Sequence, residues 1–390
     1  MSDVKNLHVG QITSFYIPPV TLVGSGSCKQ IPDRLACRDA KYPLIVTDKG
    51  IVACGILKTI TDILDAAGVK YAVYDGAVPN PTDKNVEEAF AMYKEKGCDS
   101  LLTLGGGSSH DCGKGVGFLV ANGGKIHDYE GVDKSSNPFP PYVAVNTTAG
   151  TASEMTRFCV ITDTSRKVKM AIVDWRCTPG VAIDDPDLMM GMPAGLTAAT
   201  GMDALTHAIE GFTTKGAWEM TDMFHLKAIE IIAKSLRAAV AGESEGFEGM
   251  ALGQYVAGMG FSNVGLGIVH SMAHTLGAVY DTPHGVGNAI LLPTIMEYNA
   301  PVTGDKYKYI AAAMGVEGVE AMSQEEYRKA ACDAVRKLSA DVGIPADLKD
   351  IVKAEDLDFL AESAFADACR PGNPRDTSVE EIKELFLKLM

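Results

Sequence analysis

Short apolar segments rich in β-branched residues alternate with helix-like segments through the first half of the chain. Five of these segments end in Gly, Asp or Thr, and they cover 43–48, 70–76, 100–107, 142–148 and 181–185. Helical patterns lie between them, for example over 55–68 and 82–97. This alternation predicts a parallel β-sheet covered by helices on both faces. In such a sheet, ligands bind at the carboxyl ends of the strands.

The strand signal fades after about residue 190. Helical spacing of Ala, Met and Leu then covers 219–240, 248–278 and 323–343, and a final amphipathic helix follows a cap at Thr377 or Ser378. A length of 390 residues also favours two domains over one. We therefore predict an α/β domain of nucleotide-binding type over 1–190 and an all-α domain over 191–390.

Composition excludes several classes of partner. The formal charge of −15 argues against nucleic acid and against an anionic membrane, since both require a basic surface. The N-terminus has no apolar signal-peptide core, and no stretch is apolar enough to span a membrane. The nine cysteines are odd in number and never spaced C-x-x-C, which favours reduced thiols in the cytoplasm.

Three of the eight histidines fall within the apolar stretch 267–289, at His270, His274 and His284. A buried imidazole costs free energy unless its nitrogens find partners, so each could be a core histidine bonded to a backbone carbonyl, or they could share a metal ion. Asp203 and His207 are four residues apart, which places both on one face of a helix. Alone, they could form an exposed acid–imidazole pair. Together, the two segments favour a shared Fe²⁺, Zn²⁺, Mn²⁺ or Co²⁺ ion.

A zinc protease is the obvious rival for a pair of histidines on one helix. Its H-E-x-x-H motif places a general-base Glu directly after the first His. Here that position is Ser271, so the protease interpretation is disfavoured.

Glycine and hydroxyl residues follow the predicted strands. The segment 100–115, SLLTLGGGSSHDCGKG, matches neither a P-loop nor G-x-G-x-x-G, and it could bind phosphate at a helix N-terminus or form a plain tight turn. The segment 145–154 offers hydroxyl donors, or a capped helix start with Thr148 or Thr151 and Glu154. Asp48 could bind a ribose or cap a helix at the surface.

The motifs GGGSSHD, TTAGTASE, DPDLM, TAATGMDALTHAIE, FSNVGLGIVHSMAHTLG and PHGVGNA, in this order, resemble those of the iron-containing (group III) alcohol dehydrogenases. The resemblance covers nearly the whole chain. DCGKGVG, RKVKM and VDWR are most similar to the branch that contains 1,3-propanediol dehydrogenase and NAD-dependent methanol dehydrogenase. The resemblance implies the dehydroquinate synthase-like fold of that family, in which residues 1–190 form a Rossmann-like dinucleotide-binding (NAD-binding) domain and residues 191–390 form an all-α metal-binding catalytic domain.

The resemblance also implies roles for individual residues. It assigns the metal to Asp203, His207, His270 and His284, and it places His274 near the nicotinamide as a proton relay rather than a ligand. It implies that NAD is bound by Asp48, which favours NAD over NADP, and by Gly106, Gly107, Ser108, Thr147, Thr148 and Lys169.

The implied reaction is reversible hydride transfer between NAD and a small primary alcohol or diol, with Fe²⁺, or Zn²⁺ or Mn²⁺, as the metal. 1,3-Propanediol, ethanol, butanol and methanol are the candidate substrates, and the product is the corresponding aldehyde. The family also implies a homo-oligomer, as a dimer or an assembly of dimers. The alternatives are a non-redox lyase or hydrolase on the dehydroquinate synthase-like scaffold, a glycerol dehydrogenase and a metal-storage protein.

Overall fold

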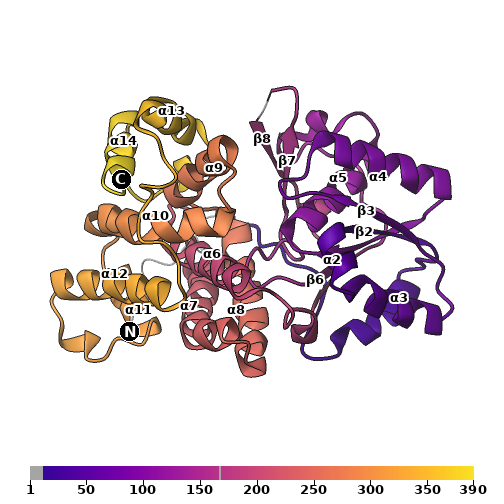
Figure 1. The fold of residues 1–390 in the computed structure, drawn as a ribbon, viewed down its shortest axis with the longest axis horizontal. Coiled ribbons are helices and arrows are strands. Elements are labelled where there is room, and N and C mark those ends of the chain that lie inside the picture. Colours follow the sequence, from indigo (N-terminus) through magenta and orange to yellow (C-terminus); the bar gives the residue numbers. More distant parts are fainter. Residues whose placement is uncertain (1–11, 167) are drawn as a thin grey trace. The chain divides into compact units, whose positions relative to one another are not determined.

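A computed structural model describes residues 12–166 and 168–390, which form two compact units (Figure 1). One unit is Tyr16–Met192, and the other is Pro193–Met390 together with residues 12–15. The ring of Phe15 stacks on Phe224 of the second unit, with ring centroids 5.7 Å apart. The division in the structure thus falls at 192/193, and residues 12–15 group with the helices rather than with the α/β unit.

The α/β unit is built on a six-stranded sheet in which all neighbouring strands are parallel. In spatial order its strands are β1 (Val20–Val23), β9 (Val181–Asp184), β6 (Tyr142–Asn146), β4 (Ser100–Gly105), β2 (Pro43–Asp48) and β3 (Ala72–Ala77). The five strands predicted from the sequence are all present, and the fold class is confirmed. The edge strand β1 was not predicted.

A second, three-stranded sheet was also missed. It contains β5 (Gly131–Val132), β8 (Val168–Val173) and β7 (Phe158–Asp163), with β7 and β8 antiparallel. The alternative of a capped helix start at Thr148 or Thr151 is wrong, since residues 147–157 form a loop that leads directly into β7. The sequence there contains residues that could cap a helix, but the chain continues instead into β7, which pairs with β8.

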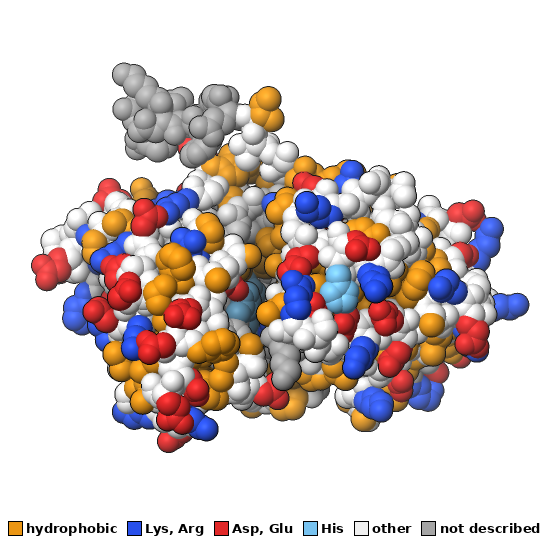
Figure 2. Space-filling model, turned by 90° about the horizontal axis from the view of Figure 1, so that it is seen from above, with side chains coloured by type: hydrophobic (Ala, Val, Ile, Leu, Met, Phe, Trp, Pro, Cys, Tyr) orange, Lys and Arg blue, Asp and Glu red, His pale blue; other side chains and the backbone are white. Residues whose placement is uncertain are grey.

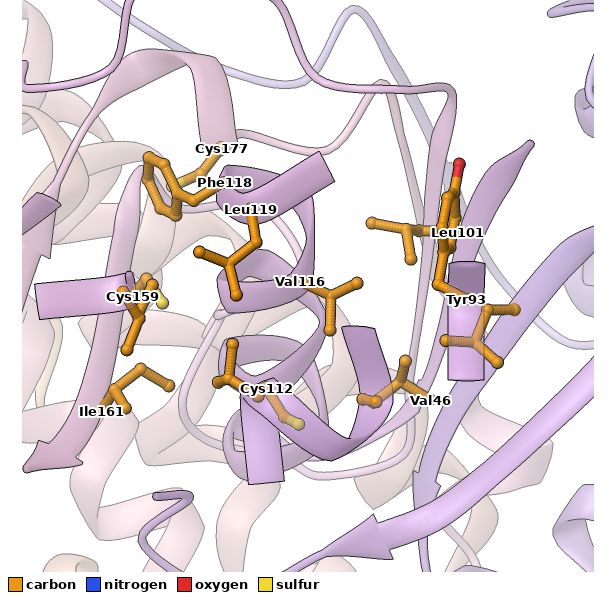
Figure 3. Close-up of a cluster of buried hydrophobic side chains, with 14 of the residues drawn as sticks. Val46, Tyr93, Leu101, Cys112, Val116, Phe118, Leu119, Cys159, Ile161 and Cys177 are labelled. Carbon is orange, nitrogen blue, oxygen red and sulfur yellow. The ribbon is translucent and has the colours of Figure 1, made fainter. Parts of the chain in front are cut away.

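Helices cover both faces of the main sheet, as the alternating pattern predicts. They are α1 (Ile31–Ala36), α2 (Lys49–Ala53), α3 (Ile56–Ala66), α4 (Asp83–Lys96) and α5 (Gly107–Asn122). Leu44 and Val46 of β2 pack into the hydrophobic cluster on the α4–α5 side, whereas Ile45 packs into the cluster that includes α3. Successive strand residues point to opposite faces, so a continuous apolar run serves two cores. Figure 3 shows the first of these clusters.

Glycines allow α5 to lie close against its neighbours. A Cβ at Gly113 would collide with Thr103 of β4, and one at Gly115 would lie 2.6 Å from a methyl carbon of Val86 in α4. The two glycines of the DCGKG segment are therefore explained by helix packing, independently of any ligand. Close helix–strand approach places the N-terminus of α5 directly beyond the end of β4.

The other unit is helical. Its helices are α6 (Ala194–Thr213), α7 (Glu219–Val240), α8 (Ser244–Val264), α9 (Ile268–Tyr280), α10 (His284–Asn299), α11 (Lys306–Ala313), α12 (Gln324–Asp341), α13 (Leu357–Ala366) and α14 (Val379–Leu387). The predicted helical stretch 248–278 is divided at Gly265, whose φ of +81° belongs to the left-handed region. Ser378, one of the two predicted caps, forms a capping box with Glu381 at the start of α14.

Charged side chains of both signs lie on the described surface (Figure 2). Figure 2 shows Lys and Arg side chains interspersed with Asp and Glu over the visible face. None of the helices in the described part of the chain combines the length and apolar character needed to cross a membrane.

His225 of α7 is a fully buried imidazole between α6 and α8. A Cβ at Gly211 or at Gly260 would collide with its ring, so the two glycines create the space that it fills. Neither ring nitrogen has a hydrogen-bond partner among the described residues. Burial, together with the nearby charge of Lys306, lowers the pKa of His225 to about 3. The ring is therefore neutral at ordinary pH and resists protonation as the pH falls.

This burial predicts an acid-sensitive contribution to stability. The unfolded chain takes up a proton at His225 near pH 6.5, whereas the folded chain does so only near pH 3, so stability is complete above pH 6.5 and is lost as the pH falls toward 3. Between pH 7.5 and pH 5.0 the loss from this residue is about 2 kcal/mol. Urea unfolding of His225→Gln in a metal chelator should show a pH dependence weaker than that of the wild type by this amount. An unchanged pH dependence would contradict the prediction.

Candidate functional site

Three helices of the helical unit bring the predicted metal residues together. Helix α6 carries Asp203 and His207 one turn apart, α9 carries His270 at its first turn, and α10 begins at His284. Helix α10 packs against both α6 and α9. Asp203, His207 and His270 are buried, while the side chain of His284 is 33 % exposed, which leaves the cluster accessible from one side.

The donor atoms of this cluster converge. Asp203 Oδ1 lies 3.6 Å from His284 Nε2 and 3.7 Å from His270 Nε2. The donor atoms of these three residues all lie within 4.8 Å of one another. His207 Nε2 is 4.0 Å from the same Asp203 oxygen, and its ring stacks on His270 with centroids 4.6 Å apart. The structure thus brings three of the four residues into one tight group, with His207 alongside.

Asn288 occupies the point on which these donor atoms converge, and it was missed in the sequence. Its Nδ2 donates to Asp203 Oδ1 at 2.7 Å and lies 3.2 Å from His270 Nε2 and 3.1 Å from His284 Nε2. An electropositive N–H group is therefore surrounded by one carboxylate oxygen and two imidazole nitrogens. Asn288 is one helical turn after His284 on α10, so the i, i+4 spacing of PHGVGN was the available signal.

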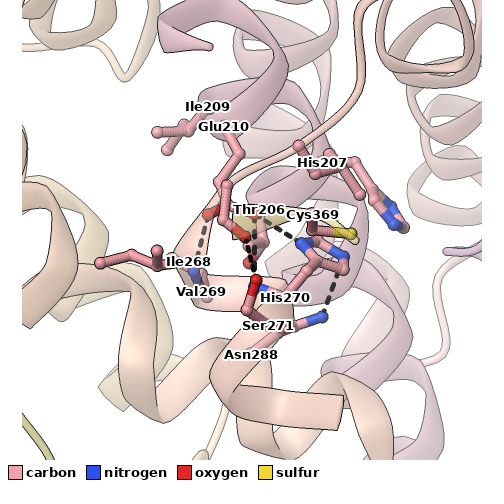
Figure 4. Close-up of polar contacts among 12 residues, drawn as sticks. Thr206, His207, Ile209, Glu210, Ile268, Val269, His270, Ser271, Asn288 and Cys369 are labelled. Carbon is pink, nitrogen blue, oxygen red and sulfur yellow. Dashed lines mark hydrogen bonds and ion pairs between the residues drawn. The ribbon is translucent and has the colours of Figure 1, made fainter. Parts of the chain in front are cut away.

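The ring of His270 presents a neutral nitrogen to this point. Burial, with the neighbouring imidazoles, holds the pKa of His270 well below its usual range. Its Nδ1 lies 2.6 Å from Glu210 Oε2, a second residue that was missed in the sequence (Figure 4). Burial raises the pKa of Glu210, while backbone N–H groups of Val269 and His270 oppose the rise.

The donor set fits a divalent transition metal. Neutral imidazoles and a carboxylate are the ligands that Fe²⁺, Zn²⁺ and Mn²⁺ accept in proteins. The three donor atoms all lie within 3.2 Å of the amide nitrogen of Asn288, so they converge on one place. The Oδ1 of Asn288 is buried without a hydrogen-bond partner among the described residues, so the same amide also carries an unused acceptor.

His274 is outside this tight group. Its Nδ1 lies 2.9 Å from Asp367 Oδ2, and its ring stacks on His284 with centroids 5.3 Å apart. Its side chain is 23 % exposed, compared with 2 % for His270. The charge of His274 and its hydrogen bond oppose the effect of burial and lower the pKa of Asp367 to about 2. Asp367 is 93 residues away in sequence, and no local pattern pointed to it.

The α/β unit carries a second candidate site at the carboxyl ends of its strands. From β2 the chain passes to β3 on one side, whereas β4 pairs with β2 on the other, which makes the β2–β4 boundary a topological switch point. Asp48 ends β2, and its Oδ1 accepts the N–H groups of Gly50 and Ile51 as the cap of α2. Its Oδ2 accepts the hydroxyl of Ser109 at 3.2 Å. The capping alternative is thus observed, and the carboxylate also lies at the glycine loop.

The predicted phosphate-binding residues meet at the same edge. Helix α5 begins after Gly106 without a side-chain cap, and Gly107 and Ser108 form its first turn. The backbone N–H of Thr147 donates to Gly105, and a Cβ at Gly106 would lie 2.7 Å from the methyl carbon of Thr148. The loops after β4 and β6 are therefore in contact, with the N-terminus of a 16-residue helix between them.

Two lysines near this edge differ in their surroundings. Lys114 is fully buried, and its ammonium donates to Ser153 and to the carbonyls of Thr156 and Phe158, so it ties α5 to the loop before β7. Lys169 lies on β8 of the smaller sheet and is half-buried. Burial raises the pKa of Asp111, and the charges of Lys114 and Lys169 oppose that rise. Lys169 is thus electrostatically close to α5.

Comparison with known proteins matches both the α/β part and the helical part of the chain to one family. Residues 18–186 match the model of the iron-containing alcohol dehydrogenases, and residues 197–390 match the model of the C-terminal part of that family. Lactaldehyde reductase of Escherichia coli is 52 % identical, over 93 % of this chain and 96 % of its own length. NAD-dependent methanol dehydrogenase of Bacillus methanolicus is 43 % identical, over 96 % and 99 %.

A solved structure of 1,3-propanediol oxidoreductase superposes with a TM-score of 0.95 at 44 % identity, over 97 % of this chain and all of that one. Both halves of the chain are therefore matched, in sequence and in fold. The chain belongs to the iron-containing alcohol dehydrogenase family and is an oxidoreductase of alcohols and aldehydes.

Proposed function

We propose that this protein is a metal-dependent, NAD(H)-linked dehydrogenase that interconverts small primary alcohols or diols with their aldehydes. The observation that carries the proposal is the convergence of Asp203, His270 and His284 on one point. A glycine loop at a helix N-terminus provides the dinucleotide site in the other unit. A metal-storage role would leave that second arrangement unexplained.

Asp203, His207, His270 and His284 would hold the ion, which is Fe²⁺ by family and fits Zn²⁺ or Mn²⁺ equally well by ligand type. When bound, the ion supplies a Lewis acid for the alcohol oxygen. The protein contributes neutral imidazoles and one carboxylate, so its ligand set carries a single negative charge. Burial of Asp203 and His270 excludes water from their side of the site.

His274 is the proposed proton relay. Asp367 accepts a hydrogen bond from Nδ1, which leaves Nε2 as the atom that takes up and releases the alcohol proton. The partial exposure of His274 allows this proton to reach solvent, whereas the buried His270 has no such path. The stacked ring of His284 keeps the relay beside a metal ligand.

NAD would be bound at the carboxyl ends of β2, β4 and β6. The free N–H groups of Gly107 and Ser108 at the start of α5 would receive the pyrophosphate from beside Gly106, and Thr147, Thr148 and Lys169 would line the remaining cofactor. Asp48 would bind the adenosine ribose and repel the 2′-phosphate of NADP. When bound, NAD would supply the hydride acceptor of the reaction.

The relatives set the range of substrates. Their names specify lactaldehyde, 1,3-propanediol and methanol, which are all small. We include ethanol and butanol as the further unbranched alcohols that the motifs predict. We also propose a cytoplasmic homo-oligomer, built as a dimer or from dimers. All nine cysteines are free thiols, which supports a reducing compartment.

Removal and replacement of the metal tests the reaction. Protein stripped by a chelator should form no NADH from any of these alcohols and should not oxidise NADH with lactaldehyde. Anaerobic addition of Fe²⁺ or Zn²⁺ should restore activity, and the substrate panel then ranks the alcohols. If folded protein binds the ion but shows no NADH formation or consumption, the dehydrogenase proposal fails and the lyase alternative becomes the better one.

Substitution of His274 tests the relay. His274→Gln should lower kcat about 100-fold or more, as expected for loss of a general acid–base group, and should flatten the pH profile of kcat. Metal content, measured by elemental analysis, should remain that of the wild type. Loss of the metal would show instead that His274 is a ligand.

Asp48→Asn tests cofactor selection without removing the helix cap, because Asn caps helices as well as Asp. Removal of the negative charge should raise the ratio of kcat/KM for NADP to that for NAD by on the order of 10-fold. Asp174→Asn is a matched control, since Asp174 caps the 3-10 turn Trp175–Cys177 elsewhere in the same unit. A rise of the same size in the control would remove the argument for Asp48.

A further inference from the structure

We infer that Glu210 is the positioning residue of the metal site: it fixes the ring of His270 so that Nε2 is available as a ligand, and thereby sets the affinity for the metal. The inference rests on the metal site of the proposed function and names a residue that none of the predicted site roles includes. Its basis is the position of one buried carboxylate between two helices.

Glu210 lies on the same face of α6 as Asp203 and His207, one turn further along. It is 4 % exposed, and it contacts α9 rather than the cluster point itself. Its Oε2 lies 2.6 Å from His270 Nδ1, and its Oε1 accepts the backbone N–H of Val269 at 2.8 Å (Figure 4). The carboxylate is therefore held by the ring and by the first turn of α9 at once.

The first turn of α9 needs these contacts. Its N-cap is Gly267, which has no side chain to accept the free N–H groups of the helix start. Glu210 accepts those of Val269 and His270, and Asn373 lies 3.4 Å from that of Ile268. A negative charge at a helix N-terminus is favourable, which retains the carboxylate in a buried position. These contacts with the helix start thus hold the carboxyl group of Glu210 in place.

This arrangement decides which nitrogen of His270 carries the proton. Both oxygens of Glu210 face N–H donors of the backbone, so Glu210 is the acceptor and the ring proton lies on Nδ1. Nε2 then keeps its lone pair and faces Asp203 and Asn288. An outer carboxylate that orients a metal-bound imidazole in this way typically changes metal affinity 10- to 100-fold.

Gly267 leaves the space that the carboxyl group of Glu210 occupies. A Cβ at this position would lie 2.8 Å from Glu210 Oε1 and 2.9 Å from Asn373 Oδ1. Its backbone φ of −142° is open to any residue, so the steric demand comes from the approach of the carboxylate and not from the backbone. The close approach of Glu210 therefore requires the absence of a side chain here.

The decisive variant is Glu210→Gln, which keeps the size of the side chain. The amide has one oxygen for two groups of N–H donors, so its NH2 either opposes the backbone N–H of Val269 or faces His270 Nδ1 and moves the ring proton to Nε2. Competition with a chromophoric chelator for Zn²⁺ should show an affinity about 10- to 100-fold weaker than that of the wild type. The visible spectrum of the Co²⁺-loaded protein should change as well.

Asp367→Asn is the matched control. Asp367 accepts from Nδ1 of His274, the other imidazole of α9, so the control removes a similar carboxylate from a histidine that is not a proposed ligand. Its Zn²⁺ affinity should remain within about threefold of the wild type. A loss equal to that of Glu210→Gln would show that lost negative charge, and not the position of His270, controls the affinity.

A double-mutant cycle separates orientation from helix capping. In a His270→Ala background, Glu210→Gln should produce no further loss of Zn²⁺ affinity, because Glu210 acts through that ring. An undiminished loss would overturn the inference. Gly267→Ala provides an independent route if Glu210→Gln does not fold. It should weaken Zn²⁺ binding, whereas Gly195→Ala, a position with open space around it, should not.

The outcomes distinguish the two proposals. If the wild-type protein binds neither Zn²⁺ nor Co²⁺, both the metal-dependent function and the role of Glu210 are wrong. If the wild type binds and the folded Glu210→Gln or Gly267→Ala protein binds equally well, only the role of Glu210 is wrong.

Discussion

A buried imidazole or carboxylate costs free energy unless its polar atoms find partners, and this requirement organises the centre of the helical unit. Asp203, His207, Glu210 and His270 lie among apolar residues of α6 and α9. Each of the contacts described among them satisfies two groups at once. The partners come from different helices, so the cluster forms only when α6, α9 and α10 have packed correctly. Formation of the metal site therefore depends on the packing of these helices.

The two imidazoles of α9 differ in the burial of the carboxylates that they contact, and this difference suits them to different roles. His270 and His274 have the same residue type, the same helix and the same orientation by spacing. Each contacts a carboxylate through Nδ1, yet one carboxylate is deeply buried and the other lies near solvent. Burial suits a ligand that must remain neutral and fixed. Partial exposure suits a group that exchanges protons with water.

The candidate site of the α/β unit is formed by different groups from those of the metal site. Its ligand groups are backbone N–H groups and hydroxyls at strand ends, which the parallel topology brings to one edge without any long-range side-chain contact. Gly113 and Gly115 let α5 approach β4 and α4 closely, which places the helix N-terminus beside the loop after β6. The ammonium group of buried Lys114 donates its hydrogen bonds to the loop before β7 and to the start of that strand, so it is not available to a phosphate.

Periodic patterns in the sequence were sufficient for the elements and their class. Short β-branched apolar runs such as 43–48 indicated strands, and the i, i+4 spacing of Asp203 with His207 and of His270 with His274 followed directly from the sequence. β1 and the smaller sheet escaped because short strands depend on partners that are distant in sequence.

The tertiary structure alone decided what each polar side chain contacts. Glu210 and Asp367 lie 60 and 93 residues from the histidines that they hold, and Asn288 reaches Asp203 across 85. Hydrogen bonds act over about 3 Å, so such pairs exist only once packing has brought the helices together. Sequence periodicity determines which face of a helix is presented, and packing determines what that face meets.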